Sequence, residues 1–423
     1  MVNNFTKIVK KALILTEVFP PAFNPRIGYL VKYLPSYDWQ ADIITQNTFK
    51  DNNFKYLIGN NKIIRVDVTN MDTPIGYIEK IWRLINRKRH FRNNKKPFIR
   101  AIESSLIKED YSVIFISVSW NMFVLEAAYV VAKKWSLPLI VDLRDIHEQK
   151  PSMINHSRNL RSVLFQYLDQ TFYKMVIRLR NNIVSKADAV ISVSPWHVGY
   201  LSKLNKNVFL IYNGYDPKLF FPGIPVRTNK FLITYTGIVN SEDQQDPGLL
   251  FQAVKKLDEQ DMFTEDLFRI QFYTPKKFRK YIEENKLYPR VKKYIDFFDY
   301  VDYQDVPRIL NYSSICLVLT NISNKDGPRG VLTTKFFEYL GVERPVLCVR
   351  SDEDILEDTI RKLNIGIAAR TVNDAENFIK EKWYEWKDKG YTTANVTKNY
   401  KYQFSREYQA NQFVEILNQV SNL

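Results

Sequence analysis

Short apolar segments rich in Val, Ile and Leu alternate with helical patterns along nearly the whole chain, and this alternation constrains the fold more than any other feature. Near-continuous apolar strands separated by helices are typical of parallel sheets covered by helices on both faces. In the first half of the chain, strands are predicted at residues 12–16, 41–45, 63–68, 113–117, 137–143, 189–193 and 208–212. In the second half they are predicted at residues 231–236, 269–273, 295–298, 315–319, 345–349 and 366–369. The sequence therefore predicts an α/β protein with two doubly wound parallel sheets.

The length of the chain and one irregular segment indicate two domains. The 423 residues exceed what a single hydrophobic core usually contains. Residues 213–229 are rich in Gly and Pro and lack any periodicity, which predicts a linker. We expect a first domain at residues 1–215 and a second at residues 225–400. A last helix is expected at residues 405–423, with Ser405 as its N-cap.

The segment 327–341, with the sequence GPRGVLTTKFFEYLG, has the pattern of a phosphate site. It follows an apolar strand and a polar loop and then opens a helix, whose free N–H groups and positive dipole end can bind an anion. Lys335 in the first turn adds a full positive charge. Glu338, one turn later, can accept hydrogen bonds from the two vicinal hydroxyls of a ribose. The segment predicts a site for a nucleoside diphosphate; the alternative is a solvated Lys–Glu pair on a helix surface.

A charged cluster follows the predicted strand 137–143, where ligands of open parallel sheets bind. It contains Arg144, Asp145, His147 and Glu148. Charges after a buried strand are costly unless they are paired or functional. We favour a functional cluster, and the alternative is a group of salt bridges that satisfy one another.

Two further strand ends carry residues suited to a ligand. The loop 17–28 is stiffened by three prolines, and Arg26 and Gly28 stand where the next helix opens. A purely structural turn explains that loop about as well. Gly237 ends the strand 231–236 and would allow a ligand to approach the backbone closely.

Several of these segments resemble motifs of glycosyltransferases with the GT-B fold, in particular the retaining group called glycosyltransferase family 4. The matching segments are Asp-Leu-Arg-Asp at 142–145, Ala-Asp-Ala-Val-Ile-Ser-Val-Ser at 187–194, Asn-Gly-Tyr-Asp at 213–216, and 327–341. Glu338 matches the glutamate that holds the donor ribose in this family. Three positions depart from the family pattern. Gly330 replaces a first glutamate, Arg144 replaces a frequent histidine, and Val239 and Asn240 replace a basic residue.

The resemblance implies two Rossmann-like domains facing across a cleft, with the C-terminal helix crossing back to the first domain. It also implies transfer of a sugar, with retention of configuration, from a UDP- or GDP-linked donor to an acceptor hydroxyl, without a metal or other cofactor. Asp145 and Arg144 are the implied catalytic residues. The implied donor-binding residues are Gly237, Arg329, Gly330, Val331, Thr333, Thr334, Lys335 and Glu338.

The chain carries a net charge of +15, and the positive charge is unevenly spread, with two basic, aromatic stretches at residues 80–100 and 158–186. Such stretches suit an anionic membrane surface or, through counterion release, nucleic acid. A solvated face is the alternative. Because no nucleic-acid-binding module is recognised, we expect no nucleic-acid partner. We expect instead a lipid-linked or polysaccharide acceptor at a membrane, as in bacterial surface polysaccharide or glycolipid assembly.

The remaining features concern location and rival functions. Cys316 and Cys348 lie in apolar runs and are expected to be buried core residues of a protein in a reducing compartment. No secretory signal is visible, and the four histidines form no metal-ligand pattern. We expect a cytoplasmic protein that is peripheral on the inner face of the cell membrane. The rival functions are a GT-B nucleotide-sugar epimerase and a non-catalytic basic protein that binds nucleic acid or membranes.

Overall fold

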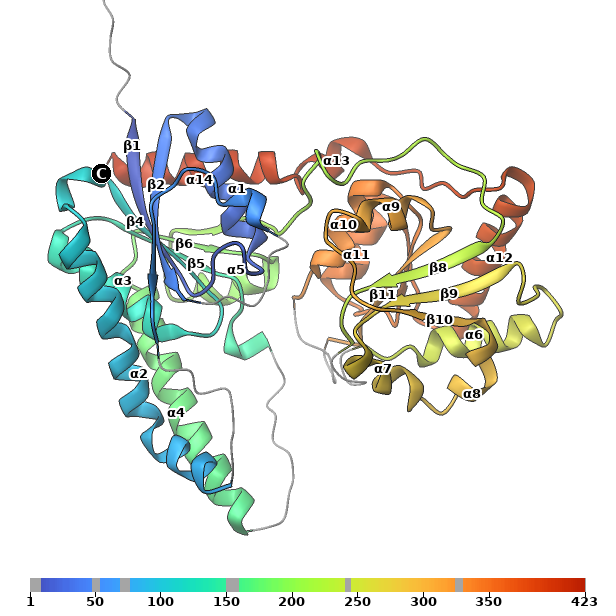
Figure 1. Cartoon of the computed structure of the whole chain (residues 1–423), viewed down its shortest axis with the longest axis horizontal. Helices are drawn as coiled ribbons and strands as arrows, with labels where there is room; N and C mark the ends of the chain where they lie inside the picture. Colours follow the sequence, from blue (N-terminus) through green and yellow to red (C-terminus); the bar gives the residue numbers. More distant parts are fainter. Residues whose placement is uncertain are drawn as a thin grey trace, which may run out of the picture. The chain divides into compact units, whose positions relative to one another are not determined.

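The computed structural model describes residues 9–47, 54–68, 77–149, 160–239, 245–323 and 330–422. The chain forms two compact units. The first comprises Met1–Glu148, Ser152–Tyr212 and Gln409–Leu423, and the second comprises Gln149–Pro151 and Asn213–Tyr408. Each unit contains one parallel sheet with helices on both faces (Figure 1). This confirms the predicted fold class.

The first unit is built on a seven-stranded sheet in the order β3-β2-β1-β4-β5-β6-β7, with all neighbours parallel. Its strands are β1 Lys10–Thr16, β2 Trp39–Gln46, β3 Ile63–Val66, β4 Val113–Val118, β5 Leu139–Leu143, β6 Ala189–Ser192 and β7 Val208–Leu210. All seven strands predicted for this half are present. Burial on both faces explains why their apolar runs are nearly continuous.

Alternate residues of β1 point to two different helix layers, because successive side chains of a strand face opposite sides of the sheet. Leu13 and Leu15 join a core with α2, α3 and α4, whereas Ala12 and Ile14 join a core with α1 and α14. The helices of this unit are α1 Pro25–Tyr33, α2 Tyr77–Ser105, α3 Met122–Trp135, α4 Leu160–Val184, α5 Pro195–Leu201 and, for most of its length, α14 Arg406–Ser421. Both faces of the sheet are therefore buried.

The predicted C-terminal helix is confirmed as α14, which packs on the first unit (Figure 1). The Ser405 hydroxyl accepts a hydrogen bond from the Tyr408 amide over 3.2 Å, as expected of an N-cap. Phe413 lies with its ring centroid 5.8 Å from that of Phe115 on β4. The last helix thus completes a core that begins at the other end of the chain.

The second unit is built on a six-stranded parallel sheet in the order β10-β9-β8-β11-β12-β13. Its strands are β8 Phe231–Thr236, β9 Phe268–Tyr273, β10 Ile295–Phe298, β11 Ile315–Leu319, β12 Val346–Val349 and β13 Gly366–Ala368. All six strands predicted for this half are present. Its helices are α6 Gly248–Asp258, α7 Lys276–Glu283, α8 Tyr288–Val291, α9 Val306–Asn311, α10 Thr334–Val342, α11 Ile355–Leu363, α12 Val372–Lys389 and α13 Lys398–Tyr402.

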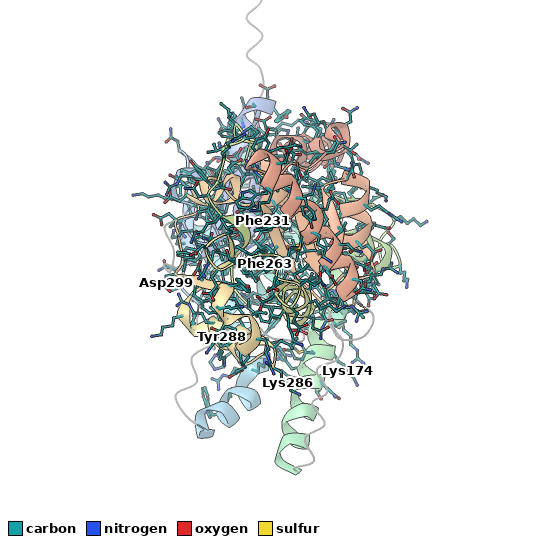
Figure 2. The ribbon with its side chains drawn as sticks, turned by 90° about the vertical axis from the view of Figure 1, so that its right-hand side faces the viewer. Lys174, Phe231, Phe263, Lys286, Tyr288 and Asp299 are labelled. Atoms are coloured by element: carbon teal, nitrogen blue, oxygen red, sulfur yellow. The ribbon has the colours of Figure 1, made fainter. Side chains whose placement is uncertain are left out.

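Aromatic side chains fill much of the core of the second unit. The rings of Phe263 and Phe268 stack with centroids 3.9 Å apart, and Phe231 and Trp383 pack beside them. Phe231 and Phe263 project onto the middle of this unit in Figure 2, whereas Asp299 projects onto its edge. Burial of several large rings provides a sizeable hydrophobic contribution to stability.

The two cysteines meet the expectation for core residues. Cys316 lies on β11 and Cys348 on the neighbouring strand β12, and both are buried free thiols. Burial raises the pKa of each thiol, which favours the unreactive protonated form.

A buried ion pair connects three elements of the first unit. Arg26 of α1 donates to Asp142 of β5 over 2.8 and 3.1 Å, and Ser117 of β4 donates to the same carboxylate over 2.8 Å. Arg26 also donates to the carbonyl of Tyr212 over 2.8 Å. Arg26 is 3% and Asp142 0% exposed. The guanidinium of Arg26 is therefore bound by groups of the protein itself. This agrees with the interpretation of the loop 17–28 as a structural turn.

We predict that Asp142→Ala destabilises the first unit by about 3–5 kcal/mol, because it leaves the Arg26 charge buried without its partner. The matched control is Glu103→Ala, which breaks the exposed Lys134–Glu103 pair and should cost less than about 1 kcal/mol. Urea unfolding of both variants measures the difference. Equal losses would contradict the proposed importance of the buried pair.

Candidate functional site

Each sheet has a point at which the strand order reverses, between β1 and β4 in the first unit and between β8 and β11 in the second. In open α/β sheets, ligands bind beyond the carboxyl ends of the strands at such a point. Gly237 directly follows β8, and the loop after β11 leads into α10 with Lys335 and Glu338. These predicted donor-site residues therefore lie at the reversal point of the second sheet.

The start of α10 defines which predicted amides belong to a helix N-terminus. Thr333 is the N-cap, and its hydroxyl accepts a hydrogen bond from the Phe336 amide over 3.4 Å. Thr334 and Lys335 occupy the first turn, where N–H groups have no acceptor within the helix. Gly330, with a φ of 67°, and Val331 lie in the loop before the helix. Arg329 lies outside the described residues.

Lys335 packs directly against Gly237, which connects two predicted site residues that are far apart in the sequence. A β-carbon at position 237 would lie only 1.9 Å from Cε of Lys335, and Gly237 has a φ of 131°. The Lys335 ammonium lies 5.4 Å from the ring centroid of Tyr235. Only glycine provides both the space and the backbone conformation at this position.

A buried tyrosine attaches α10 to the end of β8. The Tyr339 hydroxyl accepts a hydrogen bond from the Thr236 amide over 3.1 Å and lies 3.2 Å from the Thr236 hydroxyl. Tyr339 is one residue after Glu338, so this attachment fixes the helix where its charged side chains emerge. The first turn of α10 is thereby held against the carboxyl end of β8.

Lys335 is half-buried and Glu338 is buried. Burial lowers the pKa of Lys335, while the nearby Glu338 carboxylate opposes this effect. Burial raises the pKa of Glu338 to about 7, against the opposing influence of Lys335, Tyr303 and Arg406. Glu338 is only 7% exposed. The alternative of a solvated Lys–Glu pair is therefore wrong for this helix.

Sequence reasoning missed Tyr303 and Arg406, the two partners of Glu338 from other elements. Tyr303 precedes α9, and Arg406 is the first residue of α14. Neither residue belongs to a motif, and their distance from Glu338 in the sequence leaves no local signal. Only the packing of separate segments around α10 reveals them.

The corresponding position in the first unit is occupied by a carboxylate of the protein itself. Glu17, after β1, accepts hydrogen bonds from the amides of Ser119 over 2.8 Å and Asn121 over 3.0 Å, at the start of α3. Arg144 donates to Glu17 over 2.9 Å and to Asn24 over 3.1 Å. This helix start already contains an anion and its counter-charge.

The charged cluster after β5 separates into paired groups. Arg144 pairs with Glu17 as described, and Glu148 binds Arg180 through two hydrogen bonds of 2.7 Å. Asp145 is partly buried, and the negative charge of its carboxylate favours the protonated form of the buried His197. Burial lowers the pKa of His197 to about 4, although Asp145 and Glu148 oppose this. Asp145 and Arg144 thus lie at the same sheet edge, with Arg144 held by structural partners.

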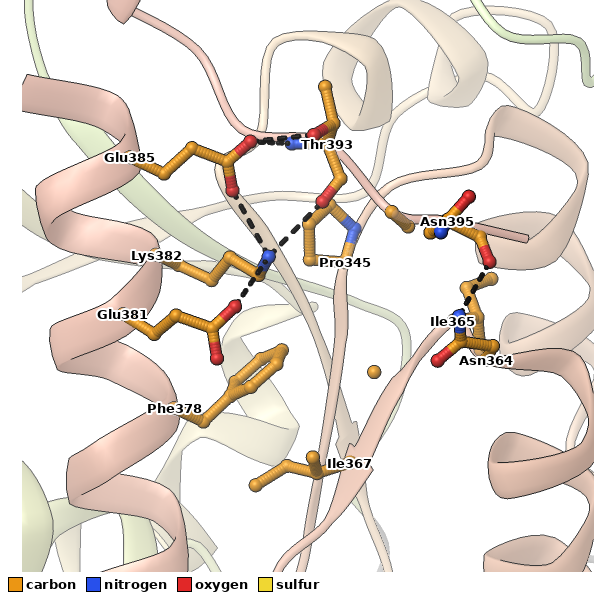
Figure 3. A pocket seen from close by; sticks show the side chains of 12 residues that line it. Pro345, Asn364, Ile365, Ile367, Phe378, Glu381, Lys382, Glu385, Thr393 and Asn395 are labelled. Atoms are coloured by element: carbon orange, nitrogen blue, oxygen red, sulfur yellow. Dashed lines mark hydrogen bonds and ion pairs between the residues drawn. The ribbon is translucent and has the colours of Figure 1, made fainter. Parts of the chain in front are cut away.

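A large hollow lies elsewhere on the second unit, at the edge strand β13 (Figure 3). It has a volume of about 650 Å³ and is lined by residues of α12, the start of β13 and the segment near Thr393. Its central lysine, Lys382, lies 3.0 Å from Glu381 and 3.1 Å from Glu385. Since Pro345 and Gly366 precede or begin their strands, this hollow lies at the amino ends of the strands, opposite to the expected ligand edge.

No protein-family model and no curated protein sequence matches the chain. Several solved structures are similar to it. Sucrose-phosphate synthase from Thermosynechococcus elongatus is similar over 97% of this chain and 98% of its own, with a TM-score of 0.64 and 15% identity. Anabaena HepE, solved in complex with UDP and glucose, is similar over 97% of this chain and 100% of its own, with a TM-score of 0.63 and 14% identity. The chain has the GT-B fold.

Proteins with this GT-B architecture are not all transferases. A putative UDP-N-acetylglucosamine 2-epimerase from Listeria monocytogenes is similar over 96% of this chain and 94% of its own, with a TM-score of 0.55 and 13% identity. At identities this low, the likeness establishes the fold alone. The function of this GT-B chain therefore has to be argued from its own residues.

The raised pKa of Glu338 predicts a pH-dependent stability. Because Glu338 binds its proton at about pH 7 in the folded chain instead of near 4.5, it favours folding at low pH, and this contribution is lost as the pH rises from 4.5 through 7. Glu338→Gln should therefore raise the free energy of unfolding at pH 8 by on the order of 1–3 kcal/mol and change little at pH 4.5.

Urea unfolding at both pH values measures this effect. The exposed Glu381→Gln variant is the matched control for the loss of one carboxylate. A Glu338→Gln variant that is less stable than the parent protein at pH 8 would refute the prediction.

Proposed function

We propose that this chain is a glycosyltransferase that moves a sugar from a nucleotide diphosphate sugar, UDP- or GDP-linked, to an acceptor hydroxyl. One observation carries the proposal: Lys335 lies against Gly237 at the reversal point of the second sheet, with the buried Glu338 one helical turn further on. A cation and free amides suit a diphosphate, and a carboxylate at that spacing suits a ribose. Anabaena HepE, which has the same fold, was solved with UDP and glucose.

The proposed mechanism relies on fixed charges of the second unit, which we take as the donor domain at residues 225–400. As the bond to the sugar breaks, negative charge grows on the leaving diphosphate. The Lys335 ammonium and the amides of Thr334 and Lys335 would stabilise that charge without reorganisation. Glu338 would accept hydrogen bonds from the ribose hydroxyls, and Gly237 would let the diphosphate approach β8. Gly330, Val331 and Thr333 would line the approach to α10, and Arg329 remains a predicted contact.

The first unit, taken as the acceptor domain at residues 1–215 with the helix 405–423, would provide the catalytic side. Asp145 is the proposed group that positions the reacting sugar hydroxyl. Arg144 would hold the adjoining loop through Glu17 and Asn24. We further propose that the transferred sugar retains its anomeric configuration, as in family 4, and that the reaction needs no metal or other cofactor.

A nucleotide-sugar epimerase is the second candidate, favoured by the similarity to the Listeria epimerase. The same diphosphate and ribose contacts would serve that reaction. The two functions differ in one requirement, because only a transferase needs a separate acceptor to release the nucleotide.

We also propose that the first unit binds an anionic membrane through α2 and α4, as in bacterial surface polysaccharide or glycolipid assembly on the inner face of the cell membrane. The guanidinium of Arg87 on α2 lies 4.3 Å from the ring centroid of Phe172 on α4, which joins the two helices. Lys88, Arg89 and Arg92 are exposed, and Trp82 is 55% exposed. In the described part of the chain, every helix is too short or too polar to cross a membrane. A lipid-linked or polysaccharide acceptor suits such a surface.

The donor proposal is tested by binding and turnover of UDP- and GDP-sugars, with nucleotide release followed in the presence and absence of a lipid acceptor. We expect Lys335→Met to weaken donor binding by about tenfold to a hundredfold, because one charged hydrogen-bond donor is lost. Binding of the nucleoside alone should not change, and the exposed Lys362→Met is the control. Equal affinity of Lys335→Met and the parent protein would refute the proposed site.

The same assay separates the two candidate functions. Release of nucleotide that depends on the acceptor supports the transferase. Conversion of the donor sugar without any acceptor supports the epimerase and contradicts the transferase.

The membrane proposal predicts that replacing Lys88, Arg89 and Arg92 together by Gln lowers binding to anionic liposomes by more than tenfold, since each charge contributes about 1 kcal/mol near the surface. Arg87 is left in place because it packs on Phe172. The control replaces three exposed lysines of the second unit, Lys276, Lys277 and Lys280, by Gln. An equal loss in both triple variants, or no loss in the first, would contradict a specific membrane face.

A further inference from the structure

The segment from Lys401 to Arg406 lies along α10, the helix that carries the proposed donor site. The Lys401 ammonium donates to the carbonyl of Gly341 over 3.0 Å and to the carboxylate of Glu343 over 2.7 Å, at the C-terminal end of the helix. Phe404 packs on Phe337 with ring centroids 5.4 Å apart. A cation at a helix C-terminus is stabilising, so Lys401 complements the dipole whose other end faces the proposed diphosphate site.

The same segment is fixed from its other side by Tyr215. The Tyr215 amide donates to the carbonyl of Phe404 over 3.0 Å, and the Arg406 amide donates to the carbonyl of Tyr215 over 2.9 Å. A β-carbon at Gly341 would lie 2.5 Å from Cβ of Phe220 and 3.0 Å from the Tyr215 ring, so glycine is what allows α10 to approach this segment so closely. The backbone of Arg406 is therefore held in place, and the residue is only 3% exposed.

Three groups favour the ionised form of the Glu338 carboxylate, two by their positive charge and one by a hydrogen bond. Lys335 comes from the same helix, Tyr303 from the segment before α9, and Arg406 from the start of α14. In the proposed function, the diphosphate of the donor neutralises Lys335. Of these three groups, Arg406 is then the cation whose charge is not taken up by the donor.

We propose that Arg406 is a positioning residue of the donor site, which keeps Glu338 ionised so that it can accept hydrogen bonds from both ribose hydroxyls. This inference rests on the proposed function of the site. A protonated carboxylic acid would have to use one oxygen as a donor, and it accepts less well than the charged form. Donor recognition then depends on the segment from Lys401 to Arg406. This segment leads into the part of α14, from Gln409 onward, that belongs to the first unit.

The test compares the pH dependence of nucleotide-sugar binding in the parent protein, Arg406→Gln and Arg406→Lys. A nucleotide sugar is used because its diphosphate does not titrate between about pH 6 and 8.5, unlike that of a free nucleoside diphosphate. In the parent protein, affinity should rise through a midpoint near pH 7. In Arg406→Gln, the midpoint should move up by about one pH unit, with about fivefold weaker binding at neutral pH.

Arg406→Lys keeps the positive charge, so its affinity for the nucleotide sugar should rise with the same midpoint as in the parent protein. If Arg406 had only a structural role, this midpoint would be the same in every variant. Lys398→Gln is the control for one lost positive charge, since this lysine is exposed on the adjoining α13. If Arg406→Gln does not fold, Arg406→Met takes its place, because methionine keeps much of the side-chain volume without the charge and the same upward shift of the midpoint is expected. Tyr303→Phe should move the midpoint in the same direction, because it removes another group that favours the ionised form.

The outcomes distinguish this inference from the proposed function. If the parent protein binds no nucleotide sugar at any pH, the proposed function fails. If it binds one, but Arg406→Gln binds with an unchanged midpoint, the function stands and the role of Arg406 is refuted.

Discussion

The organisation of the second unit around α10 depends on two opposite charges, the half-buried Lys335 and the buried Glu338, held one helical turn apart. Such burial is unfavourable in itself, and its effect is visible in the lowered pKa of the lysine and the raised pKa of the glutamate. The structure retains the two charges by surrounding them with a fixed framework. Tyr339 bonds the helix to β8, Gly237 makes room for the lysine, and Tyr303 and Arg406 act on the glutamate. In the proposed function these groups are in place before the donor binds, which is what electrostatic stabilisation requires.

The two units use one architectural principle in different ways. Each has a reversal point in its sheet and a helix that starts there, α3 in the first unit and α10 in the second. In the first unit, Glu17 provides the anion and Arg144 its counter-charge. At α10 the corresponding groups are the Lys335 cation and first-turn amides that have no acceptor within the helix itself. An ion-pair network therefore stabilises the first reversal point, whereas the second has a cation and helix amides, the groups that the proposed diphosphate contact requires.

The GT-B fold is retained here at about 15% identity to solved structures, because a pattern of buried apolar positions defines the sheets and many side chains satisfy that pattern. Residues at the site have less freedom, so departures there are informative. This chain has Gly330 where the resemblance leads one to expect a glutamate, and Val239 where a basic residue is expected. Within the described residues, Lys335 on the helix and Arg406 on a distant segment place positive charge near Glu338.

Local patterns in the sequence were sufficient for the elements themselves. Apolar runs predicted all thirteen strands, Ser405 marked the start of the last helix, and the apolar neighbours of Cys316 and Cys348 indicated buried thiols. The pairing of Lys335 with Gly237, and the presence of Tyr303 and Arg406 around Glu338, appeared only in the tertiary structure. Hydrophobic periodicity is a property of neighbouring residues, so a sequence displays it directly. The environment of a buried charge is set by segments that meet only when the chain folds, and for that reason the structure alone decided it.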